Sequence, residues 1–173
     1  MNEVQETRPT SYKDKERFSS GGKTYLLILR GKWGQKIDKF IVWLTGYSVI
    51  TKQYSLATGE VYRTTLLLKT IGSKTHRLQT AALPFFVVGD EFVVRGSAGG
   101  GPTDPQWVHN IRKSSEVWVR INRKNKPMHA HVAQGLEREK LYKTLCGMSA
   151  STASYQKMCA PRELPLVVLR SWN

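Results

Sequence analysis

The strongest constraint on the fold is a run of strand-like segments that fills residues 62–134 and returns near the C-terminal end. Residues 62–69 and 78–88 are rich in β-branched and aromatic side chains, a composition typical of strands. Gly89-Asp90 separates the second of these from residues 91–96, and this two-residue spacing predicts a hairpin. Short strands joined by hairpins favour a mainly β, α+β fold, an antiparallel barrel or sandwich, over a doubly wound parallel sheet. Further strands are expected at residues 116–122, 128–134 and 164–169, a turn at 123–127, and helices at 105–114, 135–145 and 151–158.

The chain before this run has a different composition. Residues 1–23 carry few large apolar side chains, so burial cannot offset the entropy lost on ordering, and the segment is predicted to be a mobile polar tail. Residues 24–46 are predicted to be an amphipathic segment, with a helix near 35–46, and residues 47–173 form the remaining domain. Two interpretations of the helix stay open: it packs on the domain, or it lies on anionic lipid. Its apolar positions are Trp33, Ile37, Phe40, Ile41 and Leu44.

The charge balance predicts an anionic partner. The chain holds 27 Lys and Arg against 13 Asp and Glu, a formal net charge of +14, which favours nucleic acid, a lipid surface or a phosphorylated small molecule. Cys146 and Cys159 are too few for a disulfide framework. No apolar run reaches the ~18 residues of a membrane span, and the N-terminal residues lack a signal-peptide pattern. We therefore expect a cytoplasmic protein, with peripheral contact at the cytoplasmic face of the membrane as an option.

Two loops carry residue types that bind anions. Residues 70–77 place a glycine, hydroxyl groups, Lys74 and Arg77 between two strong strands, which is compatible with a small anion nest or with an ordinary polar turn. The glycines of residues 97–101 let a ligand approach the backbone closely, although an ordinary loop is the alternative. The helix expected after Pro105 would add free N–H groups at its N-terminus. Together the two loops favour a phosphate-bearing ligand.

The remaining polar residues give weaker signals. His129 and His131 share one strand face but have no third ligand spaced near them, so no metal site is predicted. No GxSxG motif or other nucleophilic triad is present. Tyr155 is either an ordinary half-buried tyrosine or a lid whose ring covers a flat ligand and whose hydroxyl donates a proton.

The motifs follow one another in an informative order over about residues 55–170. They are LLLKT leading to GSKT, then PFF, FVVRGSAGG, PQWVHNI, VWVRI, GLEREKLY and YQ…RELPLVVL. This succession resembles the deazaflavin-dependent nitroreductase family of coenzyme F420-dependent quinone and nitro reductases. The resemblance implies a split β-barrel of the FMN-binding type with peripheral helices, and F420 in a groove at its side. It also implies hydride transfer from the reduced cofactor to a flat, electron-poor acceptor such as a quinone or nitroaromatic.

The resemblance further implies roles for individual residues. Ser97 would lie near the reactive carbon of the cofactor, and Tyr155 would cover the substrate pocket, so these two are the candidate catalytic residues. The turn would hold the cofactor's phosphate and acidic tail, the strand end after the hairpin would lie beside its ring, and the helix start would surround its linker. In that order, the candidate cofactor-binding residues are Ser73, Lys74, Thr75, Arg77 and Gln79; Arg95, Gly96, Ser97 and Ala98; and Gln106, Trp107, Val108, His109 and Asn110.

Departures from the family pattern leave room for different functions. Ser73 and Gln79 stand where arginine is common, His76 where glycine is usual, and Ala98 at a position that can be lysine. FMN in the same barrel is therefore the alternative cofactor. Two further functions stay open: a basic barrel that binds single-stranded nucleic acid, and a membrane adaptor without catalysis. The leading expectation is an enzyme that acts as a monomer on a small-molecule acceptor, with no nucleic-acid partner.

Overall fold

In the computed structural model, which describes residues 17–20, 23–26, 29, 31–58 and 60–172, the strands close into a six-stranded antiparallel barrel. The strand order around the barrel is β3-β4-β5-β8-β7-β6, and β6 pairs back with β3. The mainly β fold with peripheral helices is thereby confirmed, as a barrel and not a sandwich. Its strands are β3 (Thr65–Ile71), β4 (Leu78–Val88), β5 (Glu91–Arg95), β6 (Glu116–Ile121), β7 (Lys124–Val132) and β8 (Leu166–Ser171).

Two-residue turns with positive φ determine where two of the hairpins reverse. Gly89-Asp90 joins β4 to β5 as predicted, with Gly89 at a φ of +59°. Asn122 and Arg123 join β6 to β7, and both have positive φ, 48° and 65°, as a tight two-residue turn requires. The predicted turn at 123–127 is therefore wrong, because the chain reverses at Asn122 and β7 already begins at Lys124.

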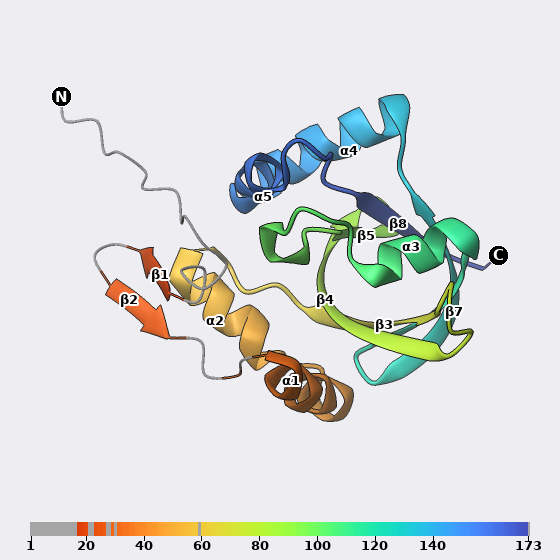
Figure 1. The fold of residues 1–173 in the computed structure, drawn as a ribbon, viewed down its shortest axis with the longest axis horizontal. Coiled ribbons are helices and arrows are strands. Elements are labelled where there is room, and N and C mark those ends of the chain that lie inside the picture. Colours follow the sequence, from red (N-terminus) through yellow and green to blue (C-terminus); the bar gives the residue numbers. More distant parts are fainter. Residues whose placement is uncertain (1–16, 21–22, 27–28, 30, 59, 173) are drawn as a thin grey trace.

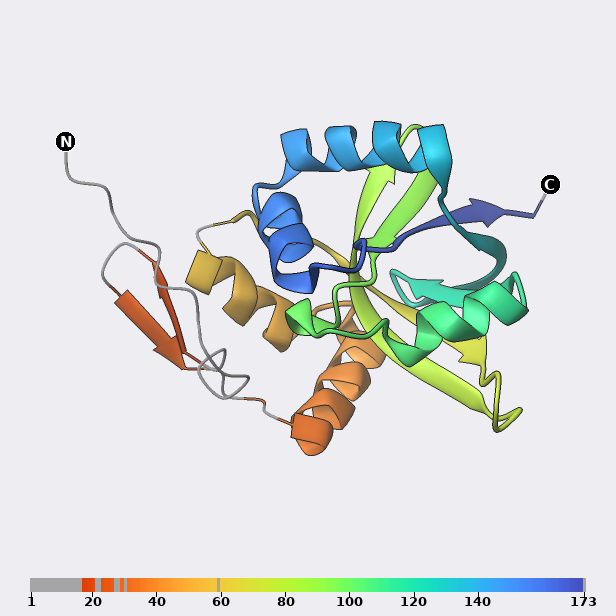
Figure 2. The same cartoon turned by 45° about the horizontal axis from the view of Figure 1, so that its top comes forward.

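The helices flank the barrel on separate sides. Figures 1 and 2 show α4 and α5 along one side and α1 and α2 on another, with the ladder of β1 (Arg17–Ser20) and β2 (Lys23–Leu26) outside them. One apolar cluster fills the barrel, and a second lies between the barrel and α4–α5. In the described part of the chain, no helix is long and apolar enough to cross a bilayer. The helices are α1 (Gly31–Thr45), α2 (Val49–Thr58), the 3-10 turn η2 (Ala98–Gly100), α3 (Gln106–Lys113), α4 (Gly135–Met148) and α5 (Ser151–Cys159).

The N-terminal part differs from the prediction. β1 lies in the predicted tail, and β2 spans the boundary between the tail and the predicted amphipathic segment, while residues 1–16 and 21–22 lie outside the described residues. No helix was expected between residues 47 and 61, where the structure has α2. Its β-branched residues disfavour a helix, but Ser48 caps it by accepting a hydrogen bond from the Thr51 N–H (3.0 Å). Asp38 of α1 adds a second cap by accepting from the Ile50 N–H (3.1 Å).

α1 packs on the domain, but of its predicted apolar positions only Ile41 is half-buried. Its buried residues are Gly34, Asp38 and Val42, and it contacts β3, β4 and α2. Asp38 is only 2% exposed because its carboxylate also accepts a hydrogen bond from Ser48 Oγ (2.7 Å). The apolar stripe faces outward: Trp33 is 76%, Ile37 49%, Phe40 61% and Leu44 54% exposed.

Candidate active site

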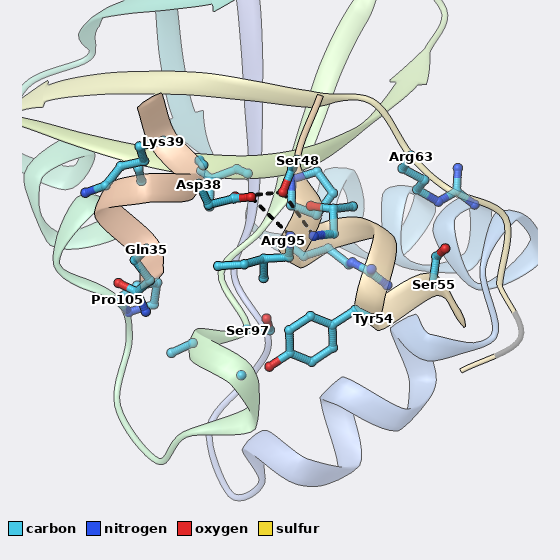
Figure 3. Close-up of a pocket in the computed structure, with 18 of the residues that line it drawn as sticks. Gln35, Asp38, Lys39, Ser48, Tyr54, Ser55, Arg63, Arg95, Ser97 and Pro105 are labelled. Carbon is cyan, nitrogen blue, oxygen red and sulfur yellow. Dashed lines mark hydrogen bonds between the residues drawn. The ribbon is translucent and has the colours of Figure 1, made fainter. Parts of the chain in front are cut away.

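A cavity of about 580 Å³ opens between the barrel and the α1–α2 pair. Its wall is built from α1, α2, the middle of β4, the end of β5 with the following loop, the start of α3, and α5. Figure 3 shows Gln35, Lys39 and Pro105 toward one end, and Arg63 and Ser55 toward the other. The predicted site residues that line this cavity are Arg95, Ser97, Ala98, Trp107 and Tyr155.

Gly96 sets the path of the chain from β5 into the cavity wall. Its N–H donates to Pro165 O (2.8 Å), and a Cβ at this position would lie 3.0 Å from Val108 Cγ2. A glycine therefore lets α3 and Pro165 approach the strand end closely. Ser97 and Ala98 follow directly and line the cavity.

Arg162 holds the loop that carries Ser97. Its guanidinium donates to the carbonyl oxygens of Ser97 (3.0 Å), Gly101 (3.0 and 3.1 Å) and Gly96 (3.3 Å). It also forms an ion pair of 2.9 Å with Asp104, and the two side chains are 15% and 12% exposed. Arg162 does not line the cavity, so the backbone around Ser97 is fixed from outside the site.

Two neighbouring glycines of the glycine-rich loop have different surroundings: Gly99 lines the cavity, and Gly100 packs against the protein. Gly99, at a φ of +64°, lines the cavity, and an added Cβ would meet nothing within 4 Å. Gly100, at a φ of +80°, faces α5, where a Cβ would lie 2.5 Å from Met158 Cε. The predicted close approach of a ligand to the glycines thus fits Gly99, whereas Gly100 makes room for the protein's own methionine.

Asn110 joins the basic turn to α3. Its Oδ1 accepts a hydrogen bond from the Ser73 N–H (2.9 Å), and its Nδ2 donates to Thr70 Oγ1 (2.9 Å) and Gln79 Oε1 (3.1 Å). Gln106 Nε2 donates to Ser73 Oγ (3.3 Å) and to Asn110 Oδ1 (3.1 Å). Asn110 is 1% exposed, and its hydrogen bonds hold the turn against α3. Because the Ser73 N–H is already paired, one donor of the predicted anion nest is not free.

The other predicted residues lie outside the cavity wall. Lys74, Thr75 and Arg77 are exposed on the turn, and His109 is exposed on α3. Val108 is fully buried in the barrel core, so its side chain packs inside the barrel. The helical phase of α3 directs Val108 inward and leaves its neighbour at the surface. The predicted residues therefore form a cavity group and a turn group that meet at α3.

Tyr155 and Arg95 form a polar corner of the cavity. Arg95 Nη1 donates to Ser151 Oγ (3.0 Å) and Thr152 Oγ1 (2.8 Å), and its Cζ lies 5.2 Å from the centroid of the Tyr155 ring. Burial raises the pKa of the Tyr155 phenol above its ordinary value, and the charge of Arg95 offsets this only in part. The phenol is therefore protonated at neutral pH and is able to donate a proton.

Glu60 connects this corner to the segment before β3. Its carboxylate accepts hydrogen bonds from Ser149 Oγ (2.6 Å), the Ser151 N–H (2.6 Å) and Ser151 Oγ (3.1 Å). Burial alone would raise the pKa of Glu60, but these hydrogen bonds and the charge of Arg95 hold it below its ordinary value. The anionic carboxylate thus sits at the N-terminus of α5, the helix that carries Tyr155.

The side of the cavity formed by α1 and α2 was not predicted from the sequence. Asp38, Lys39 and Tyr54 line it, and Lys39 Nζ donates to Thr80 O (3.1 Å). Figure 3 shows the Tyr54 ring extending from α2 toward the loop that carries Ser97. Without α2 in the predicted fold, no pattern marks Tyr54 as a cavity residue.

A comparison with known families accounts for this combination of barrel, loop and turn. The family model for F420H(2)-dependent quinone reductases matches residues 48–171. The chain belongs to this family. The match covers the barrel, α2 to α5 and both groups of predicted residues, and α1 lies outside it. It confirms the resemblance in the motifs, and with it an oxidoreductase whose family uses coenzyme F420 as cofactor.

Individual proteins that are similar to this chain support the same family assignment. An F420H(2)-dependent quinone reductase of Mycobacterium tuberculosis, Rv1261c, is 28% identical over 109 residues, which cover 60% of this chain and 71% of the relative. The structure of an F420-H2 dependent reductase, FDR-A, is 25% identical, has a TM-score of 0.54, and covers 61% of this chain and 93% of its own. A domain-swapped dimer is 23% identical with a TM-score of 0.56 and covers 80% of this chain and 97% of its own, which shows a shared fold.

The residues present fit the F420 cofactor of the family. Lys74 and Arg77 are exposed, and within the described ranges neither is in an ion pair, so their charge is free to attract an acidic group. The cavity beside Ser97 and Trp107 offers open space for a flat ring at Gly99. The start of α3 links the two parts, because Gln106 donates a hydrogen bond to Ser73 of the turn and Trp107 lines the cavity.

Proposed function

We propose that this chain transfers a hydride from reduced F420 to a quinone, with nitroaromatics as further acceptors of the same flat, electron-poor class. The observation that carries the proposal is that the start of α3 links the cavity to the basic turn. Ser97, Trp107 and Tyr155 line a cavity that adjoins, through α3, the turn bearing Lys74 and Arg77. Its volume, about 580 Å³, falls in the range of ligand pockets of ~300–1,000 Å³.

The chain's own residues would position the reactants and supply the proton. The bound cofactor supplies the hydride. Reduction of a quinone to its hydroquinone takes one hydride and one proton, so the oxygen left negative needs a proton donor. Tyr155 is protonated at neutral pH and lies in the cavity wall, and Arg95 beside it would stabilise the phenolate until water reprotonates it. The Ser97 hydroxyl is placed to donate a hydrogen bond to an oxygen of the cofactor or acceptor.

Titration with oxidised F420 tests the assignment. The fluorescence of F420 should change with saturation at low salt, and Lys74→Ala should weaken binding about two- to fivefold because an exposed cation contributes modestly to holding an acidic group. The difference should shrink as salt screens the charge. Lys126→Ala, which removes an exposed lysine of β7 far along the sequence, is the matched control and should leave the affinity unchanged.

Two outcomes of the titration contradict the assignment. One is no binding at tens of micromolar F420 in low salt. The other is a yellow purified protein, with absorbance at about 450 nm, that binds FMN in preference to F420. We also propose a monomer, because the closed barrel leaves no free edge on β3 to β8. Light scattering on the same sample should then give about 19.6 kDa, and twice that mass would indicate the dimer seen in a relative.

We also propose that α1 lies on the cytoplasmic face of an anionic membrane, where lipid-soluble quinones are found. The support is the exposed stripe of Trp33, Ile37, Phe40 and Leu44, which recurs at helical spacing along one side of α1. Lys36 adds positive charge beside it, with Nζ 4.7 Å from the centroid of the Trp33 ring. An apolar stripe flanked by lysines is the arrangement that binds interfacial helices to anionic lipid. The opposite side of α1 lines the cavity.

Sedimentation with vesicles tests this surface. The protein should bind vesicles of phosphatidylglycerol, and Phe40→Glu should weaken binding about tenfold or more, because it removes an exposed aromatic ring that would insert into the lipid and adds a charge that anionic lipid repels. Leu136→Glu, which changes a residue of α4 that is 73% exposed, is the matched control and should bind as the wild type does. Equal binding of the Phe40 and Leu136 variants would contradict a lipid contact through α1.

A further inference from the structure

Two arginines meet at one end of the cavity. Arg63 precedes β3 and Arg95 ends β5, and both line the cavity. Their Cζ atoms lie 4.2 Å and 4.8 Å from the centroid of the Phe86 ring, which is 1% exposed. Burial lowers the pKa of Arg95, and the like charge of Arg63 lowers it further, so the two guanidinium groups are near enough to repel each other. Arg95 remains charged at neutral pH.

Both guanidinium groups keep donors that the protein does not use. Arg63 Nη2 donates to Met148 O, but its Nε is buried without a hydrogen-bond partner. Arg95 donates through Nη1 to Ser151 and Thr152, and its Nε and Nη2 make no hydrogen bond within the described residues. Arg95 lines the cavity, so its Nε and Nη2 donors are the ones that can pair with a ligand there.

The two carboxylates in the cavity wall, Asp38 and Glu60, accept hydrogen bonds from groups other than the two arginines. Asp38 accepts its hydrogen bonds at the start of α2, and Glu60 accepts its bonds from Ser149 and Ser151. No ion pair joins either carboxylate to Arg63 or Arg95 in the part of the chain that the structure describes. Two cations face one anion at this end, so the cavity has an excess of positive charge that water screens less than it would on an open surface.

We propose that Arg63 and Arg95 form an anion subsite for a carboxylate or sulfonate group on the acceptor, so that acidic aromatic acceptors are preferred to neutral ones. The inference rests on the proposed function, since it places the acceptor in the same cavity. A guanidinium binds a carboxylate through two parallel N–H donors, which fixes orientation as well as affinity. An acceptor anchored here lies beside Tyr155, whose ring centroid is 5.2 Å from Arg95 Cζ.

This subsite is distinct from the basic turn that fits the cofactor. Arg63 comes before β3 and Lys74 comes after it, and the seven residues of that strand span about 23 Å. An acidic group held at the turn therefore leaves the arginine end of the cavity available for a second anion. The two sites differ in surroundings as well, because Lys74 is exposed whereas Arg63 and Arg95 are partly buried.

A binding experiment without cofactor tests the subsite independently of turnover. The probes are 2-naphthoate and its neutral analogue 2-naphthamide, titrated into the purified chain by calorimetry. We expect 2-naphthoate to bind about ten- to a hundredfold tighter, the range for a hydrogen bond to a charged group. Arg95→Gln and Arg63→Gln should each reduce this preference, and the double variant should abolish it. Arg95→Lys should keep part of it, because the charge remains while the forked geometry is lost.

A kinetic experiment tests the same preference on a reducible acceptor. The ratio of kcat/KM for 1,4-naphthoquinone-2-sulfonate to that for 1,4-naphthoquinone is compared between the wild type and Arg95→Gln, so the intrinsic reactivity of the two quinones cancels. The ratio should fall about tenfold or more in the variant. Because the ratio compares the two quinones within one variant, a loss of turnover common to both does not change it.

The outcomes separate the two proposals. Equal binding of 2-naphthoate and 2-naphthamide by the wild type would overturn the subsite, and so would a preference that survives in the double variant. A preference abolished by Lys74→Gln would also overturn it, because the anion would then bind at the turn. Failure to reduce either quinone overturns the proposed function alone, and the binding experiment then decides the subsite. Circular dichroism shows whether each arginine variant is folded.

Discussion

Replacing Arg162 with methionine should lower the free energy of unfolding by about 2–4 kcal/mol, measured by urea denaturation. The variant leaves the carbonyl oxygens of Gly96, Ser97 and Gly101 without the guanidinium that they share, in a position where water replaces it poorly. Asp104 also loses one of two arginine partners. The loop that carries Ser97 should then shift, and affinity for F420 should fall together with stability.

Arg112→Met is the matched control for this prediction. Arg112 pairs with the same Asp104 at 2.7 Å, but its side chain is 43% exposed and makes no contact with the loop carbonyls in the hydrogen bonds of the described residues. An exposed ion pair contributes about 0–1 kcal/mol, so the loss should be small. Equal losses in the two variants would show that the ion pair matters and that the hydrogen bonds to the loop do not.

Replacing Tyr155 with phenylalanine should reduce kcat for quinone reduction about 10²- to 10³-fold, with little change in F420 affinity. The substitution keeps the ring that packs beside Arg95 and removes the hydroxyl proposed as proton donor. Because burial raises the pKa of this phenol above 10.0, the protonated form persists through neutral and moderately basic pH. The kcat of the wild type should therefore show no titration by Tyr155 until the pH rises past 10.0.

Tyr142→Phe provides the comparison for Tyr155. Both tyrosines pack against the apolar cluster between the barrel and α4–α5, but Tyr142 does not line the cavity. Its variant should keep the wild-type kcat, measured under the same conditions. A kcat of Tyr155→Phe within about twofold of the wild type would refute the proton-donor role, since general acid catalysis contributes at least ~10²-fold.

The barrel strands could be predicted because their signals are local. β4 has the predicted bounds, Leu78–Val88, since its apolar run ends at Gly89-Asp90, a pair that favours a tight turn. β7 shows the limit of such signals. Residues 123–127 carry polar and proline residues typical of a turn, but the left-handed backbone of Asn122 and Arg123 reverses the chain earlier.

The parts of the site that could not be predicted depend on contacts between distant residues. α2 is helical because Asp38 accepts from the Ile50 N–H, a bond between residues that no local pattern connects. Val108 lies in the core because α3 packs with that side against the barrel. The Ser73 N–H is unavailable to a ligand because Asn110 already accepts from it. In each case a tertiary contact decides what a local motif cannot.

The α1–α2 pair contributes one side of the cavity without belonging to the hydrogen-bond ladder of the barrel. It is attached through side chains: Lys39 Nζ donates to Thr80 O (3.1 Å), and Thr51 and Thr65 share a hydroxyl hydrogen bond (2.9 Å). The turn after β3, which bears Lys74 and Arg77, lies outside the wall of this cavity. Exchanging residues 31–58 for those of a related barrel would therefore replace one wall of the cavity and leave Arg63, Arg95, Tyr155 and the basic turn unchanged.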